Sequence, residues 1–481
     1  MRPATLVRLA LAGTRTDTLR VVLTGFSAAL AALAFLAALT VRAIPTPPGD
    51  PENRAANYSM QYTNHLLMEP GLRGGLAITL LLLAIPVLAL AAQCARLGAP
   101  ARDRRLAAFR LAGATPGQAI RIAIAETGVA TLLGALAGLA VYLVGRRLLH
   151  RPDPLGQLAL PTDVLPPVSE LVGVVLVLPL LAALASAVLL RRVVVTPFGV
   201  LRRVRRRRAP LPWPAIPIAL GLAVPPLANW LIRTGRIGEG ADGLLPLAAF
   251  GCVLLAVLGV VSSAGWFSYS SGRVLHRLGR GPAALLAARR LMADPWAGSR
   301  SLMALLAALV IAGVAAGFRA GFEARARNLM AEGEEAWRNN ADQQDFYLST
   351  MDLVDLALAV ALTIAVAGML IALAEGIVAR RRTYAGLVAS GVPRVVLARS
   401  VAWQVLTPAV PAVLVALTVG LNLVWRAVAD GGAVGARITP ELPLDHLAGY
   451  AAGSLLALLA ALGVGLLFLR TSTDLEELRV A

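Results

Sequence analysis

Residues 105–118 read "RLAAFRLAGATPGQ", a short polar segment between two long apolar runs. A similar segment, "TYAGLVASGVPRVV" at residues 383–396, also lies between two apolar runs. Each is flanked by arginine, carries apolar residues at helical spacing and reaches a glycine followed by proline, which is typical of a short helix that stops there. The sequence therefore predicts the same capped helix at two equivalent places.

The apolar runs around these segments are long enough to cross a bilayer. The chain has 481 residues, is 58% hydrophobic and has a mean hydropathy of +0.72, which is well above a soluble composition. A hydrocarbon core of about 30 Å needs about 20 apolar residues per helix. We predict an all-α polytopic membrane protein with about ten spans, near residues 20–43, 75–97, 119–145, 168–190, 212–231, 244–268, 302–321, 353–377, 400–424 and 447–469.

The net charge of +18 has a distribution that favours membrane topology over nucleic-acid binding. All 45 basic residues are arginine, and most lie in segments on one side of the predicted spans, whereas most acidic residues lie on the other. This positive-inside bias predicts that both termini are cytoplasmic. The run "LRRVRRRR" at residues 201–208 is expected to contact anionic lipid head groups rather than nucleic acid. Lysine-free, alanine-rich usage is typical of high-GC bacteria, so we expect a bacterial plasma membrane.

The chain is predicted to be a duplication. An offset of 278 residues places Gly113 on Gly391 and aligns two arginines before each glycine. The predicted division is residues 1–191 with segment 101–117, residues 192–281 with a basic linker and two spans, and residues 282–481 with segment 379–395. Each outer part holds four spans in the same orientation, which makes them a parallel repeat.

These residues carry a family resemblance. The stretches "RDRRLAAFRLAGATP" (102–116) and "RRRTYAGLVASGVP" (380–393) resemble the motif after the second span of FtsX-like permeases, the membrane subunits of one class of ABC transporters. The four-span layout is similar to that family, and ten spans resemble the bacitracin-resistance type. The motif glutamate is replaced by Arg105 and Thr383, and the outer loops, 44–74 and 322–352, are too short for the large outer domain of many relatives.

The resemblance implies that each polar segment is a coupling helix that docks on an ATPase subunit. Carried onto this sequence, the implied contact residues are Arg102, Arg104, Phe109, Leu111, Gly113, Arg380, Arg382, Leu387, Ala389 and Gly391. Two such segments in one chain imply two copies of the ABC ATPase.

The chain itself is not expected to be an enzyme. It has no G-x-x-x-x-G-K-[ST] loop and no lysine to hold phosphates. We therefore expect no catalytic residues and no cofactor in this chain, with ATP and Mg²⁺ held by the partner ATPase. The four histidines are scattered without the spacing of a metal site, so no metal ligands are expected.

Three polar residues fall at the inner ends of predicted spans: Glu126, Glu375 and Gln404. Ionisable groups inside a membrane are hypotheses for functional sites. Arginines nearby offer the alternative that they pair structurally. The acidic outer loop 322–352 could likewise attract a cationic substrate or be an ordinary solvated loop.

Three functions fit the sequence. The first is the permease of an ABC transporter that exports or extracts an amphiphile, such as a peptide antibiotic, a drug or a lipid. The second is a permease that transmits force for signalling and transports nothing. The third is a secondary transporter driven by an ion gradient, which would need ionisable residues near mid-membrane. The alanine-rich stretches 26–40 and 302–316 are expected to face each other, or lipid, across a lateral cleft.

Overall fold

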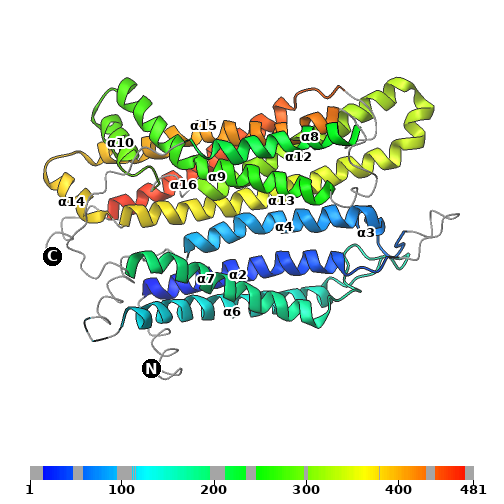
Figure 1. The fold of residues 1–481 in the computed structure, drawn as a ribbon, viewed down its shortest axis with the longest axis horizontal. Coiled ribbons are helices and arrows are strands. Elements are labelled where there is room, and N and C mark those ends of the chain that lie inside the picture. The colour runs from blue at the N-terminus through cyan, green and yellow to red at the C-terminus, as the bar shows by residue number, and fades with distance from the viewer. Residues whose placement is uncertain are drawn as a thin grey trace. The chain divides into compact units, whose positions relative to one another are not determined.

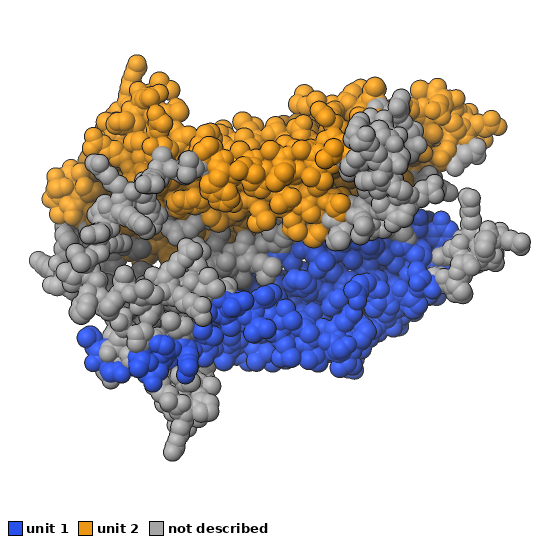
Figure 2. Space-filling view, in the orientation of Figure 1, with its two compact units in different colours: residues 1–203 blue, residues 204–481 orange. Residues whose placement is uncertain are grey.

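The computed structural model describes residues 15–46, 58–94, 111, 113, 115–194, 212–233, 245–296, 302–378, 380–429 and 439–471. The chain divides into two compact units, residues 1–203 and residues 204–481, which Figure 2 draws in blue and orange.

Unit 1 is built on four long helices. They are α2 (Arg15–Arg42), α4 (Pro70–Cys94), α6 (Pro116–Leu148) and α7 (Val168–Val194). Helix α2 packs against both α4 and α6, and α7 packs mainly against α6. A fifth, short helix, α3 (His65–Met68), lies in the connection before α4.

In unit 2, other helices pack around one central helix, α12 (Met303–Glu332). The helices of this unit are α8 (Ala215–Arg233), α9 (Leu245–Leu278), α10 (Pro282–Ala293), α12, α13 (Glu334–Val378), α14 (Arg381–Ala389), α15 (Arg394–Ala429) and α16 (Leu444–Thr471). Helix α12 packs between α13 and α15 and also contacts α9 (Figure 1). The pair α8 and α9 therefore packs within this unit, and α12 takes the same place as α2 in unit 1.

The fold class predicted from the sequence is confirmed. Seven helices of the described part, α2, α6, α9, α12, α13, α15 and α16, are long and apolar enough to cross a membrane. The apolar stretches of α4, α7 and α8 are shorter, at Leu72–Leu81, Val168–Leu184 and Ala215–Leu227. The chain is an all-helical polytopic membrane protein, and the total of ten spans stays a prediction.

The prediction that residues 322–352 form a loop is wrong, because these residues are almost entirely helical. Helix α12 continues to Glu332, α13 begins at Glu334, and only Gly333, with a φ of 122°, separates them. Figure 1 shows the two helices joined as a yellow-green hairpin. Alanine, glutamate, arginine and methionine in this stretch favour helix, and the rings of Phe322 and Tyr347 stack at 4.6 Å across the hairpin. At about 1.5 Å per residue, the 45 residues of α13 span about 67 Å, more than twice the hydrocarbon core.

The alanine-rich stretch 302–316 does not line a lateral cleft, so that prediction is also wrong. Each side chain from Ala304 to Val310 is at most 2% exposed. The surrounding helices α9, α13 and α15 all belong to the same unit. Small side chains explain the burial, because they let neighbouring helices approach α12 from several sides.

Glycines bring helix backbones into direct contact in both units. A Cβ atom added at Gly420 of α15 would lie 2.1 Å from the carbonyl oxygen of Val310 on α12. One added at Gly134 of α6 would lie 2.1 Å from the carbonyl oxygen of Gly25 on α2. The first and third long helices of each half therefore meet at positions where no larger residue fits.

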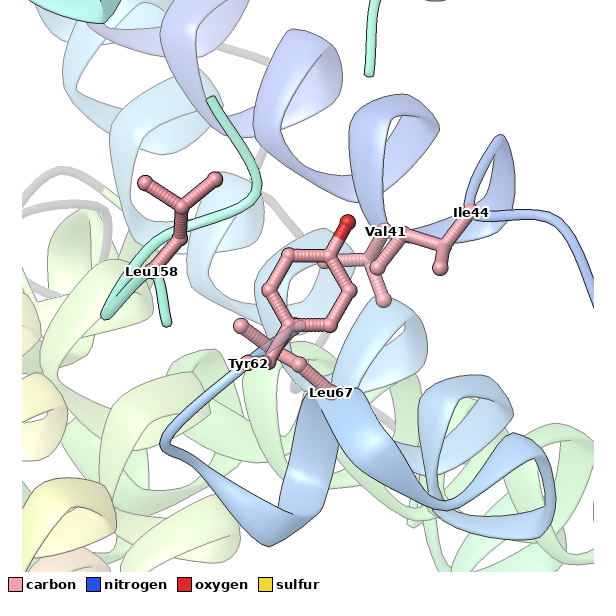
Figure 3. Close-up of a cluster of buried hydrophobic side chains, with 5 residues drawn as sticks. All are labelled: Val41, Ile44, Tyr62, Leu67 and Leu158. Atoms are coloured by element: carbon pink, nitrogen blue, oxygen red, sulfur yellow. The ribbon is translucent and has the colours of Figure 1, made fainter. Parts of the chain in front are cut away.

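The connections at one end of unit 1 form a small folded cap (Figure 3). Tyr62 is fully buried against Val41, Ile44, Leu67 and Leu158. Backbone bonds tie the two connections together: the Leu158 N–H donates to the Gln61 carbonyl at 2.8 Å, and the Thr63 N–H donates to the Leu158 carbonyl at 3.1 Å. The Tyr62 hydroxyl donates to Oδ1 of Asp163 at 2.8 Å.

A buried arginine of α4 stabilises the same cap through hydrogen bonds. Arg73, only 6% exposed, donates through Nε to the Leu67 carbonyl at 2.8 Å and through Nη2 to Oγ of Ser59 at 2.6 Å. Its Nη1 donates to the carbonyls of Ile44 and Pro45 at 3.2 and 3.1 Å. The guanidinium thus satisfies carbonyl groups that would otherwise be buried without partners.

Replacing Gly420 by valine should force α12 and α15 apart. We expect Gly420→Val to lower the free energy of unfolding by about 3 kcal/mol, the upper end for overpacked cores. The midpoint of thermal aggregation in detergent, followed by size-exclusion chromatography, measures the change. Gly453→Val on α16 is the matched control, because a Cβ there meets nothing within 4 Å. Equal midpoints for the two variants would contradict the close approach.

Burial and the bond to Asp163 raise the pKa of Tyr62 from 10.0 to about 12. Because the folded pKa lies above the unfolded one, the phenol contributes its stabilisation fully below pH 10 and loses it as the pH rises to about 12. Subtracting the ultraviolet tyrosinate titration of Tyr62→Phe from that of the wild type should isolate one group ionising near pH 12. A difference centred near pH 10 would mean that the cap is open.

Candidate functional site

The second predicted coupling segment forms a separate helix, α14 (Arg381–Ala389), between α13 and α15. At its end, the N–H groups of Gly391 and Val392 donate to the carbonyls of Val388 and Leu387, at 3.0 Å each. This pair of bonds is the Schellman motif, and Gly391 has the positive φ, 90°, that the motif requires. The glycine–proline stop predicted from the sequence is confirmed here.

One face of α14 is anchored to α10. Tyr384 is 4% exposed and Ala385 is 1% exposed. Nη1 of Arg290, on α10, donates to the Tyr384 hydroxyl at 2.6 Å, and its guanidinium carbon lies 5.2 Å from the centre of the Tyr384 ring. A charge-assisted hydrogen bond and a cation–π contact on one residue pair hold the two helices together.

The opposite face of α14 is small and open. Thr383, Gly386 and Ala389, at a spacing of three residues, are exposed, as is Gly391. Of the predicted contact residues in this half, Ala389 and Gly391 are exposed, Arg380 and Leu387 are half-buried, and the Arg382 side chain lies outside the described part. A partner protein could approach the helix backbone closely along this face.

A pocket at the base of α14 concentrates positive charge. Arg290, Asp294, Arg380, Tyr384 and Gln404 line it, together with apolar residues of α13 and α15. Burial lowers the pKa of Arg380, and repulsion from Arg290 lowers it further. The structure therefore brings together two sequence-predicted residues, Arg380 and Gln404, that are far apart in the chain.

The first predicted coupling segment is described only at its end. Its residues Arg102, Arg104 and Phe109 lie outside the described part of the chain. Leu111 is 91% exposed, and Gly113 has a φ of 91°, which matches Gly391. Thr115 and Gln118 then form a capping box, with bonds of 3.3 and 3.0 Å, that begins α6. The glycines of the two segments therefore share the same positive φ.

The three polar residues predicted inside spans are divided between the two units. Glu126, on α6, is 7% exposed and belongs to unit 1. Glu375, on α13, is half-buried. Gln404, on α15, lines the pocket below α14, and its Nε2 is buried without a hydrogen-bond partner among the described residues. Whether any of them contacts a substrate stays a prediction.

The sequence reasoning missed a charged cluster that joins three helices. Arg319 of α12, only 12% exposed, bonds to Asp352 and Asp355 of α13 at 2.7 Å each. The hydroxyl of Tyr450, on α16, donates to Asp355. The sequence does contain a pattern that indicates this cluster, because Arg319 interrupts the apolar run "GVAAGFRAGF" at residues 313–322. A single charged residue at the edge of a span is expected to have a partner of opposite charge.

Comparison with known proteins agrees with this arrangement. The model of the FtsX-like permease C-terminal family matches residues 75–197 and 356–475, just over half of the chain. One match lies in each unit, and each match includes one of the two polar segments. No curated protein and no solved structure matches the chain. The chain belongs to the FtsX-like permease family, and it is a permease component of an ABC-type system.

Proposed function

We propose that this chain is the permease of an ATP-driven transporter that extracts or exports an amphiphile, such as a peptide antibiotic, a drug or a lipid. The observation that carries the proposal is helix α14, a capped helix anchored on one face and open on the other. FtsX-like permeases generally work with an ATPase partner. Two segments, each ending at a glycine of the same positive φ, would correspond to two ATPase subunits, each of which would hold ATP and Mg²⁺.

The contacts of α14 define how force would enter unit 2. The Arg290–Tyr384 pair links α14 to α10, and short turns link it to α13 and α15. Helix α15 touches α12 at Gly420, so it cannot slide without moving α12. Helix α13 continues without interruption into the hairpin at its other end. A push on α14 would therefore move the hairpin that α12 and α13 form.

Two surfaces of unit 2 support the proposal of a cationic amphiphile as substrate. The hairpin is rich in acidic residues, among them the exposed Glu332, Glu335 and Asp345. The helix surfaces below it are apolar, as α13 shows with Leu353, Leu356 and Val360 each about half exposed or more. A cationic amphiphile matches both, because its charge and its apolar part would meet complementary surfaces.

Proline at the two equivalent glycines should abolish ATPase binding. Proline fixes φ near −65° and removes the N–H that Gly391 donates to Val388, so it cannot form this turn. We expect the double variant Gly113→Pro and Gly391→Pro to lose the ATPase encoded beside it when a tagged chain is co-purified.

The matched control is Gly113→Asn with Gly391→Asn, because asparagine tolerates a positive φ. The control should retain the ATPase, and both variants should elute from size exclusion like the wild type. Failure of the intact chain to recover any ATPase would overturn the assignment of a coupling segment.

Removing the Tyr384 hydroxyl should weaken the stimulation of ATP turnover by substrate. In proteoliposomes of the permease–ATPase complex, we expect a cationic amphiphilic peptide to stimulate ATP turnover and to be released from the membrane. Tyr384→Phe should reduce this stimulated turnover about fivefold, because it deletes a bond to a charged donor, while ATPase recovery stays unchanged. Tyr269→Phe on α9 is the control. Turnover without peptide release would favour a force-transmitting permease, and release driven by a proton gradient without ATP would favour a secondary transporter.

A further inference from the structure

An apolar groove lies between α9, α10 and α15, apart from the pocket below α14. Its walls include Trp266 and Val274 of α9 and Trp403 and Pro411 of α15. Trp266, Val274 and Trp403 are 40%, 55% and 44% exposed, so the groove is open along its length. Neither the coupling segment nor the Arg319 cluster uses these residues.

The groove runs along the last part of the candidate span of α9, Ala248–Leu278, which continues beyond residue 268, where the sequence placed its end. The Ser271 hydroxyl of α9 donates to the Thr407 carbonyl of α15 at 3.2 Å, which places the two at the same level. Thr407 lies eight residues, about 12 Å, from Arg399 at the predicted membrane surface. From Trp266 to Leu278, α9 rises about 18 Å, close to half of a bilayer about 40 Å thick with its head groups.

The interior of the groove suits a hydrocarbon chain. The Ser270 hydroxyl donates to the Trp266 carbonyl at 2.8 Å, and the Ser271 hydroxyl donates to Thr407 as described above. The Thr407 hydroxyl donates to the Trp403 carbonyl. Because all three hydroxyls are bound to backbone, an occupant needs no polar group at this depth, which disfavours a sugar or a peptide backbone.

Arg280 lies at the open end of the groove. Arg280 lines the groove just after α9 ends, is exposed, and has no ion pair within the described part of the chain. Gly279 permits this position, since a Cβ there would lie 2.3 Å from the Leu275 carbonyl, and Gly281 turns the chain into α10 with a φ of 102°. A guanidinium at the level of the head groups is a donor for a lipid phosphate.

We propose that this groove binds one anionic phospholipid from the arginine-rich side of the membrane, with its phosphate on Arg280 and an acyl chain between Trp266 and Trp403. The lipid would lie against α10, the helix whose Arg290 holds α14. The site is independent of what the permease transports, so its failure would leave the proposed function untouched.

Native mass spectrometry of the full chain in detergent tests the head group. Phosphatidylglycerol and phosphatidylcholine with identical acyl chains are the probes. We expect one phosphatidylglycerol to be retained, and Arg280→Gln to reduce its retention about fivefold, as for one arginine lost near a membrane surface. Arg277→Gln is the control, because Arg277 is also exposed at the end of α9 but does not line the groove.

A second pair of variants tests whether an acyl chain occupies the groove between Trp266 and Trp403. Val274→Trp should fill the groove and expel the lipid while leaving Arg280 in place. Leu258→Trp is its match, because Leu258 lies on the same helix and is 59% exposed, close to the 55% of Val274. If glycerol phosphate were retained as strongly as phosphatidylglycerol, the ligand would be a free phosphate compound and the proposal of a lipid would be overturned. Equal retention of both lipids, or retention unchanged by Arg280→Gln and Val274→Trp, would overturn the site.

Discussion

Direct contact between helix backbones is the constraint on which the two units depend. Inside a bilayer, lipid tails are as apolar as leucine, so burial alone does not choose which helices pair. Glycine determines the pairing, because it lets two helix backbones come into contact. Gly134 of α6 contacts the backbone of α2, and Gly420 of α15 contacts the backbone of α12. The second and fourth helices of each half then pack around a pair whose spacing is already fixed.

In the proposed function, that fixed pair would carry movement of α14 through unit 2. Helix α14 is short, but it joins the end of a 45-residue helix to the start of one that touches α12. Arg290 and Tyr384 hold it at one end of the unit. Arg319, bridging α12 and α13 through Asp352 and Asp355, and Tyr450 of α16 hold the other end. Polar contacts at both ends and small residues between them make unit 2 suited to transmit movement lengthwise.

The two halves resemble each other at one end and differ at the other. Gly113 and Gly391 have nearly equal positive φ values, 91° and 90°. At the opposite end, unit 1 folds its connections around Tyr62 and Arg73, whereas unit 2 extends two helices into a hairpin. Equal glycine φ values fit the proposed docking of two like ATPase subunits, and unequal outer ends fit the proposal of a substrate path that is not symmetric.

The sequence by itself determined the helical membrane class, the family and the helix stop at Gly391, because hydropathy, motif and local backbone geometry depend on neighbouring residues. It did not determine the hairpin at Gly333, since exposed helices rich in alanine and glutamate lack the apolar signal by which spans are recognised. Nor did it reveal that Arg290 meets Tyr384, that Arg319 meets Asp355, or that residues 302–316 are enclosed. Those contacts join residues tens of positions apart, and only the packing of whole helices brings them together.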